Sequence, residues 1–351
     1  MDNYSFWTLL NKNDKDYHMD MLLNSNWQKC GEFRTDFSNP NGYKAKYWLM
    51  DYKYHIPHFL YLPNLSFAPM RHAFHLSSFW VLNNIRNIYS PQISDIPSLE
   101  SLLIQSMSNV GIIYPGAIDL TKFDMDVNVK FKNILELKLV KEALLNLPLN
   151  NGIRKRKVFD TRDEFGLIFR SSAKKIGFSI YDKDVQMKSK YNYVNPEIEN
   201  CLRFSYRING ASAMKNLFNV KALPFDALLT PSFNKEIMEG FSKRLNELGL
   251  FEGAIIVSKD KIKKDIKLVS NRSNKKCTSV NNLSKIIKGR KDISSKEKSV
   301  LKSKCKKNGL CFTWVNNDYG RKIYPYDLVM NELKDVLNGT SDFSYKDKHA
   351  T

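Results

Sequence analysis

A tyrosine and a lysine occupy polar positions of an alternating segment and could together attack a phosphodiester. In KIGFSIYDK, residues 175–183, apolar side chains alternate with Ser179, Tyr181 and Lys183. Because successive strand side chains point to opposite faces, Tyr181 and Lys183 would share one face, about 6.6 Å apart along the strand. A neighbouring ammonium favours the ionised form of a phenol, and a tyrosinate is a competent nucleophile. The ordinary alternative, a half-buried packing tyrosine, stays open at this point.

Two further alternating segments supply cations and a carboxylate to the same kind of face. In CLRFSYRI, residues 201–208, Arg203 and Arg207 lie on the polar side, and in GAIDLTKF, residues 116–123, Asp119 does so. If these strands are neighbours, an exposed sheet face would carry all of these polar groups beside Tyr181 and Lys183. The cations could then neutralise the charge that develops at phosphorus when a phosphodiester reacts.

The elements that must position these residues predict an α+β fold. One-sided alternation is typical of an antiparallel sheet, and helical spacing over residues 96–107 and 134–147 predicts helices that cover the apolar face. A terminal helix is expected over residues 325–339. In chain order we expect four parts. The first is a β-rich aromatic region over 1–90 that could belong to the core, and the second is an α+β core over 91–255. A basic, mainly helical region with the terminal helix follows over 256–340, and a frayed tail over 341–351.

The charge of the chain indicates a polyanionic partner. Lys and Arg number 55 against 36 Asp and Glu, which gives a net charge of +19 and a pI near 9.5. Residues 259–308 alone hold 18 Lys or Arg and 4 Asp or Glu. This segment predicts a DNA backbone contact, although a merely solvated lysine-rich surface stays open. The candidate contact residues outside the polar sheet face are Lys174, Lys175, Lys275, Lys276, Lys288, Arg290 and Lys291.

Composition excludes several classes of protein. At 42% hydrophobic residues, the chain has enough apolar material for a core, which excludes wholesale disorder. Five cysteines without a paired framework argue against a disulfide-rich secreted module and favour a reducing cytosol. We find no apolar stretch near the ~20 residues that span a bilayer and no signal-peptide pattern, so no membrane partner is expected.

The polar segments also carry a family resemblance. The run GLIFRSSAKKIGFSIYDKDVQMKSK, residues 166–190, followed by CLRFSYRI, resembles the replication initiators of filamentous phages, of the gene II/X type. It is similar as well to the related rolling-circle initiators of plasmids. Upstream, GAIDLTKFDMD resembles the Arg-Ile-Asp-Leu/Ile-Thr strand of that family. The resemblance covers roughly residues 95–210.

This resemblance implies a rolling-circle nuclease-like core that nicks one strand of duplex DNA at an origin. A tyrosine attacks the phosphodiester, leaves a 5′-phosphotyrosine link and a free 3′-hydroxyl, and the strand is later rejoined. By position, the resemblance makes Tyr181 the nucleophile, Lys183 the phosphate-stabilising cation and Asp119 a ligand of Mg²⁺ or Mn²⁺. It further implies origin duplex and single-stranded DNA as partners, allows a homodimer and a host helicase, and indicates the cytoplasm of a bacterial host cell.

The sequence also departs from the family pattern, which keeps two alternatives open. Two positions that carry an acid in the family, one in the motif around Tyr181 and one in CLRFSYRI, are Gln186 and Ser205 here. Mg²⁺ and Mn²⁺ prefer oxygen anions as ligands. A non-nicking, origin-binding or regulatory protein on the same scaffold is therefore one alternative. The other is an RNA-binding protein that stacks bases on the aromatic residues of 1–90.

Histidines are weak candidates for a metal site. His72 and His75 are the better pair for a ligand set, but they are spaced by three. In a strand this spacing points the two imidazoles to opposite faces, and only a helix or a turn would bring them together. The ordinary interpretation of both is a polar or packing histidine.

Overall fold

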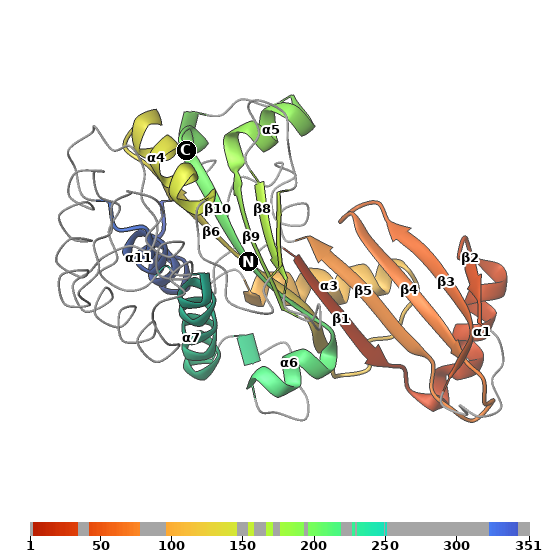
Figure 1. The fold of residues 1–351 in the computed structure, drawn as a ribbon. Helices are drawn as coiled ribbons and strands as arrows, with labels where there is room; N and C mark the ends of the chain where they lie inside the picture. Colours follow the sequence, from red (N-terminus) through yellow and green to blue (C-terminus); the bar gives the residue numbers. More distant parts are fainter. Residues whose placement is uncertain are drawn as a thin grey trace. The chain divides into compact units, whose positions relative to one another are not determined.

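The computed structural model describes residues 3–33, 42–77, 96–145, 154–157, 166–170, 176–192, 196–218, 227–228, 230–248, 250 and 323–342. The fold is α+β, with antiparallel strands and packed helices, as the alternation predicted (Figure 1). No helix among the described residues has the length and apolar character needed to cross a bilayer.

The chain divides into two compact units, each assembled from separate segments of sequence. The first holds residues 1–126, 207–236 and 336–351, and the second holds residues 127–206 and 237–335. Strands β6 (Asp119–Lys130) and β10 (Cys201–Asn209) contribute residues to both units. The division into consecutive parts expected from the sequence stays a prediction.

The sheet of the first unit has the strand order β2-β3-β4-β5-β1-β6. Neighbouring strands of this sheet pair antiparallel, and Ser5 of β1 lies opposite both His75 of β5 and Lys122 of β6. The other strands of this sheet are β1 (Asn3–Leu9), β2 (Gln28–Glu32), β3 (Tyr43–Asp51), β4 (Ile56–Pro63) and β5 (Arg71–Ser77). The β-rich character expected for residues 1–90 is therefore present in the described part of that region.

One face of this sheet is buried and the other is half-exposed. Along β4 the burial alternates residue by residue, which is the signature of a sheet covered on one side. The helices α1 (Lys15–Asn24) and α3 (Ile96–Asn109) belong to this unit. Ser106 of α3 contacts His58 on the buried face, with 2.8 Å between Oγ and Nε2. Thus α3 covers the sheet of the first unit (Figure 1).

The second unit has the strand order β6-β10-β9-β8-β7. The remaining strands and the helices of this region are β7 (Arg154–Lys157), β8 (Gly166–Arg170), β9 (Ile176–Asp182), α4 (Ile134–Leu145), α5 (Lys183–Tyr191) and α11 (Pro325–Asn338). Helices α6 (Ala211–Phe218) and α7 (Pro231–Leu248) follow β10.

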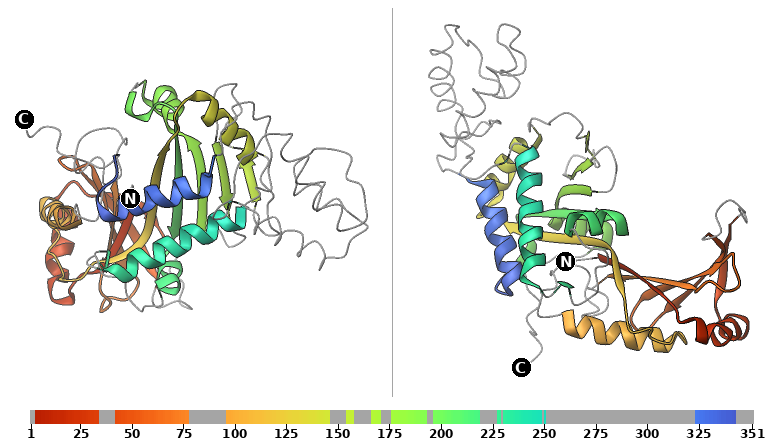
Figure 2. Two further views of the ribbon diagram at one scale, coloured as in Figure 1. Left: turned by 90° about the vertical axis from the view of Figure 1, so that its left-hand side faces the viewer. Right: turned by 90° about the horizontal axis from the view of Figure 1, so that it is seen from below.

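The core of the second unit lies between its strands and the helices α7 and α11. The ring of Phe241 on α7 packs edge-on against Phe178 of β9 and Tyr206 of β10, at centroid distances of 5.2 and 5.9 Å. Figure 2 shows α7 and α11 lying across one face of these strands. Of the apolar residues predicted to face inward, Phe178, Ile180 and Phe204 are buried, whereas Ile176 at the start of β9 is half-exposed. The helices on this face are thus α7 and α11, of which α11 corresponds to the terminal helix expected over residues 325–339.

Candidate active site

Tyr181 stands near the end of β9, on the side of the strand away from the core. Phe178 and Ile180 are buried, whereas Tyr181 is half-exposed. Its partner on the neighbouring strand β8 is Gly166, which has no side chain to cover the ring from that position. The tyrosine therefore occupies the polar side of the alternation, as predicted, at a place where the strand is about to end.

The strand ends because the next residue caps a helix. Asp182 has an extended backbone, and its Oδ1 accepts a hydrogen bond from the backbone N–H of Val185 at 3.1 Å, which is an ordinary helix N-cap. Its other carboxylate oxygen forms an ion pair with Lys141 of α4. Since Asp182 is buried and holds two elements in place, its role in this arrangement is structural.

Lys183 is placed differently from the prediction. It is the first residue of α5, not a strand residue, and its side chain is fully buried, not exposed. Its Nζ donates a hydrogen bond to Oε1 of Gln186 at 3.1 Å and lies 6.0 Å from the ring centroid of Tyr181. The turn at Asp182 thus replaces the expected spacing along a strand, yet it keeps the ammonium near the outer limit of a cation–π contact with the tyrosine.

Arg203 is also buried, which corrects the expected exposed face. Its guanidinium is fully excluded from solvent, and its Nε donates to Oδ1 of Asn128 on β6 at 2.7 Å. Ser205, two residues further along β10, is buried as well. Alternation had placed these side chains opposite the apolar core, but it carries no information on whether that second face is covered. Arg203 is therefore not a surface DNA contact in this structure.

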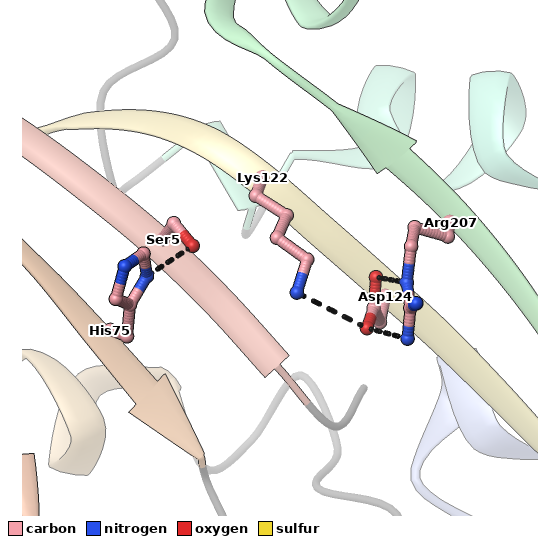
Figure 3. Close-up of polar contacts among 5 residues, drawn as sticks. All are labelled: Ser5, His75, Lys122, Asp124 and Arg207. Atoms are coloured by element: carbon pink, nitrogen blue, oxygen red, sulfur yellow. Dashed lines mark hydrogen bonds and ion pairs between the residues drawn. The ribbon is translucent and has the colours of Figure 1, made fainter. Parts of the chain in front are cut away.

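Arg207 is the exposed arginine of β10, and it lies in the first unit. Its Nε and Nη2 donate to the two carboxylate oxygens of Asp124 on β6, both at 2.8 Å, and Lys122 lies 3.7 Å from the same carboxylate. Figure 3 shows this cluster together with the Ser5–His75 hydrogen bond. A bidentate pair of this kind fixes the guanidinium in position, so the charge of Arg207 is matched by Asp124.

The structure does not bring the predicted metal ligands together. His72 and His75 lie on opposite faces of β5, because their spacing of three falls on a strand. His75 is exposed and contacts Oγ of Ser5 through Nδ1 at 2.6 Å. Asp119 pairs with Trp7 of β1 in the sheet register, on the half-exposed face. Within the described part of the chain, no group of three or more His, Cys, Asp or Glu side chains could hold a metal ion.

His72 belongs instead to a buried polar network of the first unit. Its Nε2 lies 3.0 Å from Nδ1 of His58, and Nε2 of His58 lies 2.8 Å from Oγ of Ser106. Ser106 in turn donates to Oδ2 of Asp51 at 2.5 Å. Burial lowers the pKa of His58 to about 4 and holds the pKa of His72 well below its usual range. Both imidazoles are therefore neutral near pH 7 and sealed from solvent, which suits a structural network.

The acidic residues near Tyr181 are engaged in the helix that follows it. Asp182 caps α5 and pairs with Lys141, and Asp184 pairs with Lys188 one turn later at 2.7 Å. The position of a family acid is Gln186, whose amide oxygen accepts from Lys183. A carboxylate set for a divalent cation is therefore not assembled from these residues.

Seven of the predicted DNA contacts lie outside the described residues. These are Lys174, Lys175, Lys275, Lys276, Lys288, Arg290 and Lys291. The whole basic segment 259–308 lies there as well, and its DNA-binding role stays a prediction.

Two features of the first unit were missed by sequence reasoning. One is the buried histidine network, whose members come from β3, β4, β5 and α3 and share no sequence signal. The other is the half-exposed sheet face, on which rings and cations alternate with buried residues. Its signal was present in IPHFLYLP, where Phe59 and Tyr61 are two residues apart, and in YKAKYWLMD, where Lys46 and Trp48 are.

Comparison with known proteins gives a distant likeness among solved structures. No protein-family model matches the chain, and no curated protein matches its sequence. Among solved structures, the chain is similar to a rolling circle replication initiator protein from Geobacillus stearothermophilus. The alignment covers 70% of this chain and 83% of that chain, with 10% sequence identity and a TM-score of 0.35. A likeness at this level carries no conclusion about activity.

Proposed function

We propose that the protein initiates rolling-circle replication by nicking one DNA strand, with Tyr181 as the nucleophile. The observation that carries the proposal is the setting of Tyr181. It is half-exposed at the end of a strand, faces a glycine on the next strand, and has the Nζ of Lys183 within 6.0 Å of its ring. The sequence motifs that resemble those of the initiators indicate which reaction a tyrosine in this position would carry out.

The proposed step is a phosphoryl transfer from DNA to the tyrosine. The phenolic oxygen of Tyr181 loses its proton to solvent and forms a bond to phosphorus, while the bond between phosphorus and the 3′-oxygen breaks. The 3′-oxygen takes up a proton and becomes a free hydroxyl, and the 5′-phosphate stays linked to the tyrosine. The reverse attack by that hydroxyl rejoins the strand. The ammonium of Lys183 is proposed to favour the phenolate beside which it lies.

A requirement for Mg²⁺ or Mn²⁺ stays a prediction. The donors proposed from sequence, Asp119, His72 and His75, do not form a common site, and the carboxylates next to Tyr181 bind Val185, Lys141 and Lys188. Because these residues do not fit a divalent cation, no step of the proposed reaction passes through one.

The partners proposed for this activity are origin duplex DNA and the single strand that the nick releases. The basic segment 259–308 is proposed to contact the backbone, so deleting it should weaken DNA binding and flatten its salt dependence. If the deletion leaves the salt dependence of DNA binding unchanged, the segment is a solvated surface that does not contact DNA. A homodimer, a host helicase as partner and a place in the bacterial cytoplasm stay predictions.

A second candidate is a DNA-binding protein on this scaffold that does not cut. Two observations favour it: Gln186, at a family acid position, holds Lys183, and Ser205, at another, lies buried beside Arg203 on β10. An RNA-binding protein remains the third alternative, and competition between duplex DNA and single-stranded RNA separates it from the first two.

The decisive experiment incubates the full-length protein with a supercoiled plasmid that carries its own replicon, with and without Mn²⁺. Nicking would convert the plasmid to its open circle and leave protein covalently bound to DNA. Tyr181→Phe should abolish the adduct and leave DNA binding nearly unchanged, whereas Tyr324→Phe, at another exposed tyrosine, should behave as the natural protein. An adduct that persists in Tyr181→Phe rejects the assignment, and intact supercoiled plasmid with the natural protein favours the second candidate.

A further inference from the structure

The half-exposed face of the first unit's sheet gathers aromatic rings around positive charges. We call it the aromatic face. Its register joins Trp48 to Phe59, Lys46 to Tyr61 and Tyr61 to Arg71 as directly opposed neighbours on β3, β4 and β5. Opposed residues of an antiparallel pair share one side of a sheet. The aromatic face comprises Trp7, Phe33, Tyr43, Lys46, Trp48, Phe59, Tyr61, Arg71 and His75.

The cations of this face lie on the rings. The Nζ of Lys46 is 4.2 Å from the ring centroid of Phe59 and 5.6 Å from that of Tyr61. The guanidinium of Arg71 is 4.9 Å from the ring centroid of Trp7 and 5.7 Å from that of Tyr61. The two cations therefore stand among flat hydrophobic groups, a combination that can accept a charged backbone and planar bases together.

Neighbouring rings extend the face at both ends. Phe33 stacks on Tyr61 at a centroid distance of 6.5 Å, and Tyr43 lies 5.4 Å from the same ring. On the other side, His75 meets Phe59 edge-on at 5.3 Å. The rings thus form two groups, one around Tyr61 and one at Phe59 and His75, and Lys46 lies over a ring of each group.

The described helices of this unit pack against the opposite face. α3 contacts His58 through Ser106, and α1 places His18 close enough to His72 to help lower the pKa of His72. Phe233 of α7 packs edge-on against Phe123, at a centroid distance of 5.4 Å, and Phe123 lies opposite buried Tyr4. Trp7, Trp48, Phe59 and Tyr61, by contrast, are half-exposed. Along the described residues of β4 and β5, the cover is therefore one-sided.

Charge on the aromatic face favours an anionic occupant. Lys46 and Arg71 are joined on this side by Lys122 of β6. Asp124 is matched by Arg207, which leaves Asp119 as the other carboxylate on this side of the described strands. An apolar protein partner would leave Lys46 and Arg71 without a counter-charge, whereas a nucleic-acid backbone supplies one; Lys122 already lies 3.7 Å from the carboxylate of Asp124.

We propose that the aromatic face binds single-stranded DNA, with bases stacked on the rings and phosphates at Lys46, Arg71 and Lys122. Unpaired bases present flat π-faces that stack on aromatic side chains without regard to sequence, whereas the bases of a duplex are already stacked on each other. The choice of DNA over RNA rests on the proposed nicking function, which releases a single strand. The stacking surface itself rests on the geometry alone.

The test measures binding of a fluorescein-labelled 20-nucleotide oligo-dT to the full-length protein by anisotropy. Phe59→Leu and Tyr61→Leu keep apolar volume in the strand and remove the stacking ring, so each should weaken binding about tenfold. Tyr52→Leu, at a strongly exposed tyrosine in the turn between β3 and β4, is the matched control and should bind as the natural protein. Circular dichroism and the thermal midpoint verify that each variant folds.

A second measurement uses salt. Lys46→Met should reduce the slope of log Kd against log salt concentration by about 0.7, the value for one phosphate contact on a single strand. Unchanged affinity in both leucine variants, with an unchanged slope in Lys46→Met, overturns the proposal. Tighter binding of 20-nucleotide oligo-U than of oligo-dT overturns the choice of DNA. Since this binding needs no nicking, Tyr181→Phe should bind oligo-dT normally. A missing adduct with the natural protein would reject the nicking function without touching the aromatic face.

Discussion

The polar side of the second unit and the aromatic face of the first unit differ in cover, although both arise from the same strand alternation. In the second unit Arg203 and Lys183 are fully buried and bonded to the amide oxygens of Asn128 and Gln186. In the first unit Arg71 lies on half-exposed rings. The comparison teaches that a cation on the non-core side of a strand can serve either as an internal support or as a binding surface.

Tyr181 stands at the border between these two situations. It lies on the side of β9 opposite the core, where its ring is half-exposed, as are Gly177 and Ser179 on the same side. Because β9 ends at Asp182 and the chain turns into α5, the tyrosine escapes the cover that seals Lys183. A reactive group supported by buried charges and open to solvent is the arrangement that catalysis by an activated nucleophile needs.

The largest expected effect comes from removing the buried arginine. Arg203→Met should lower the free energy of unfolding by about 3 kcal/mol, because it leaves the amide of Asn128 without its buried donor and deletes a fully packed charge. Arg71→Met, on the aromatic face, should cost at most about 1 kcal/mol, the usual worth of a partly exposed cation–π contact. Urea unfolding of the two variants measures the loss of unfolding free energy in each. Equal losses would show that the cations of the two faces do not differ in how strongly they stabilise the fold.

The next largest effect is a pH dependence of the unfolding free energy that comes from the buried histidines on the covered side of the first unit's sheet. His58 is neutral and buried with a folded-state pKa of about 4, while an unfolded histidine has a pKa near 6.5. Since the unfolded chain then binds more protons, stability should be complete above pH 6.5 and fall as pH drops toward 4, by about 2 kcal/mol between pH 7 and pH 5 from this residue. His72 acts in the same direction.

The matched variant for the pH experiment is His58→Gln, which keeps polar atoms but does not titrate. Its unfolding free energy should vary less with pH over the same range, by roughly the 2 kcal/mol assigned to His58. A pH dependence that is identical in the natural protein and in His58→Gln would show that this imidazole is not neutral in the folded protein.

The smallest effects contrast two glycines. A Cβ added at Gly240 of α7 would lie 2.9 Å from Oη and 3.2 Å from ring atoms of Tyr206, which is buried in the core of the second unit. Gly240→Ala should therefore destabilise the protein by about 1 kcal/mol, since overpacking outweighs the gain in helix propensity. At Gly31 of β2 no atom lies within 4 Å of the added Cβ. Gly31→Ala should stabilise by about 0.5 kcal/mol, and thermal unfolding shows whether the two signs differ.

Much of the fold was predictable because local periodicity reports it directly. The helices expected over 96–107 and 134–147 are present as Ile96–Asn109 and Ile134–Leu145. The side of β9 and β10 that each residue occupies also follows from the period of two. The placement of Lys183 did not, because the N-cap geometry at Asp182 converts a continuing strand into a helix one residue after Tyr181.

The candidate site shows the same limit. The positions of Tyr181 and the polar residues of β10 on the non-core side could be derived from sequence, whereas the burial of Arg203 and Lys183 could not. Their partners, Asn128 and Gln186, are an amide 75 residues away in sequence and an amide one helical turn away. The separation of His72 from His75 was predictable once residues 71–77 were a strand, but the stacking of His72 on His58 depends on the pairing of β4 with β5.

By itself, the order of residues determined the α+β class, the alternation of the strands, the excess of positive charge and the choice of Tyr181 as the candidate nucleophile. Tertiary structure alone decided which polar faces are sealed and which are open, and which distant strands lie side by side. The physical reason is that side-chain direction follows from the local backbone, whereas burial depends on what other segments of the chain pack against that side.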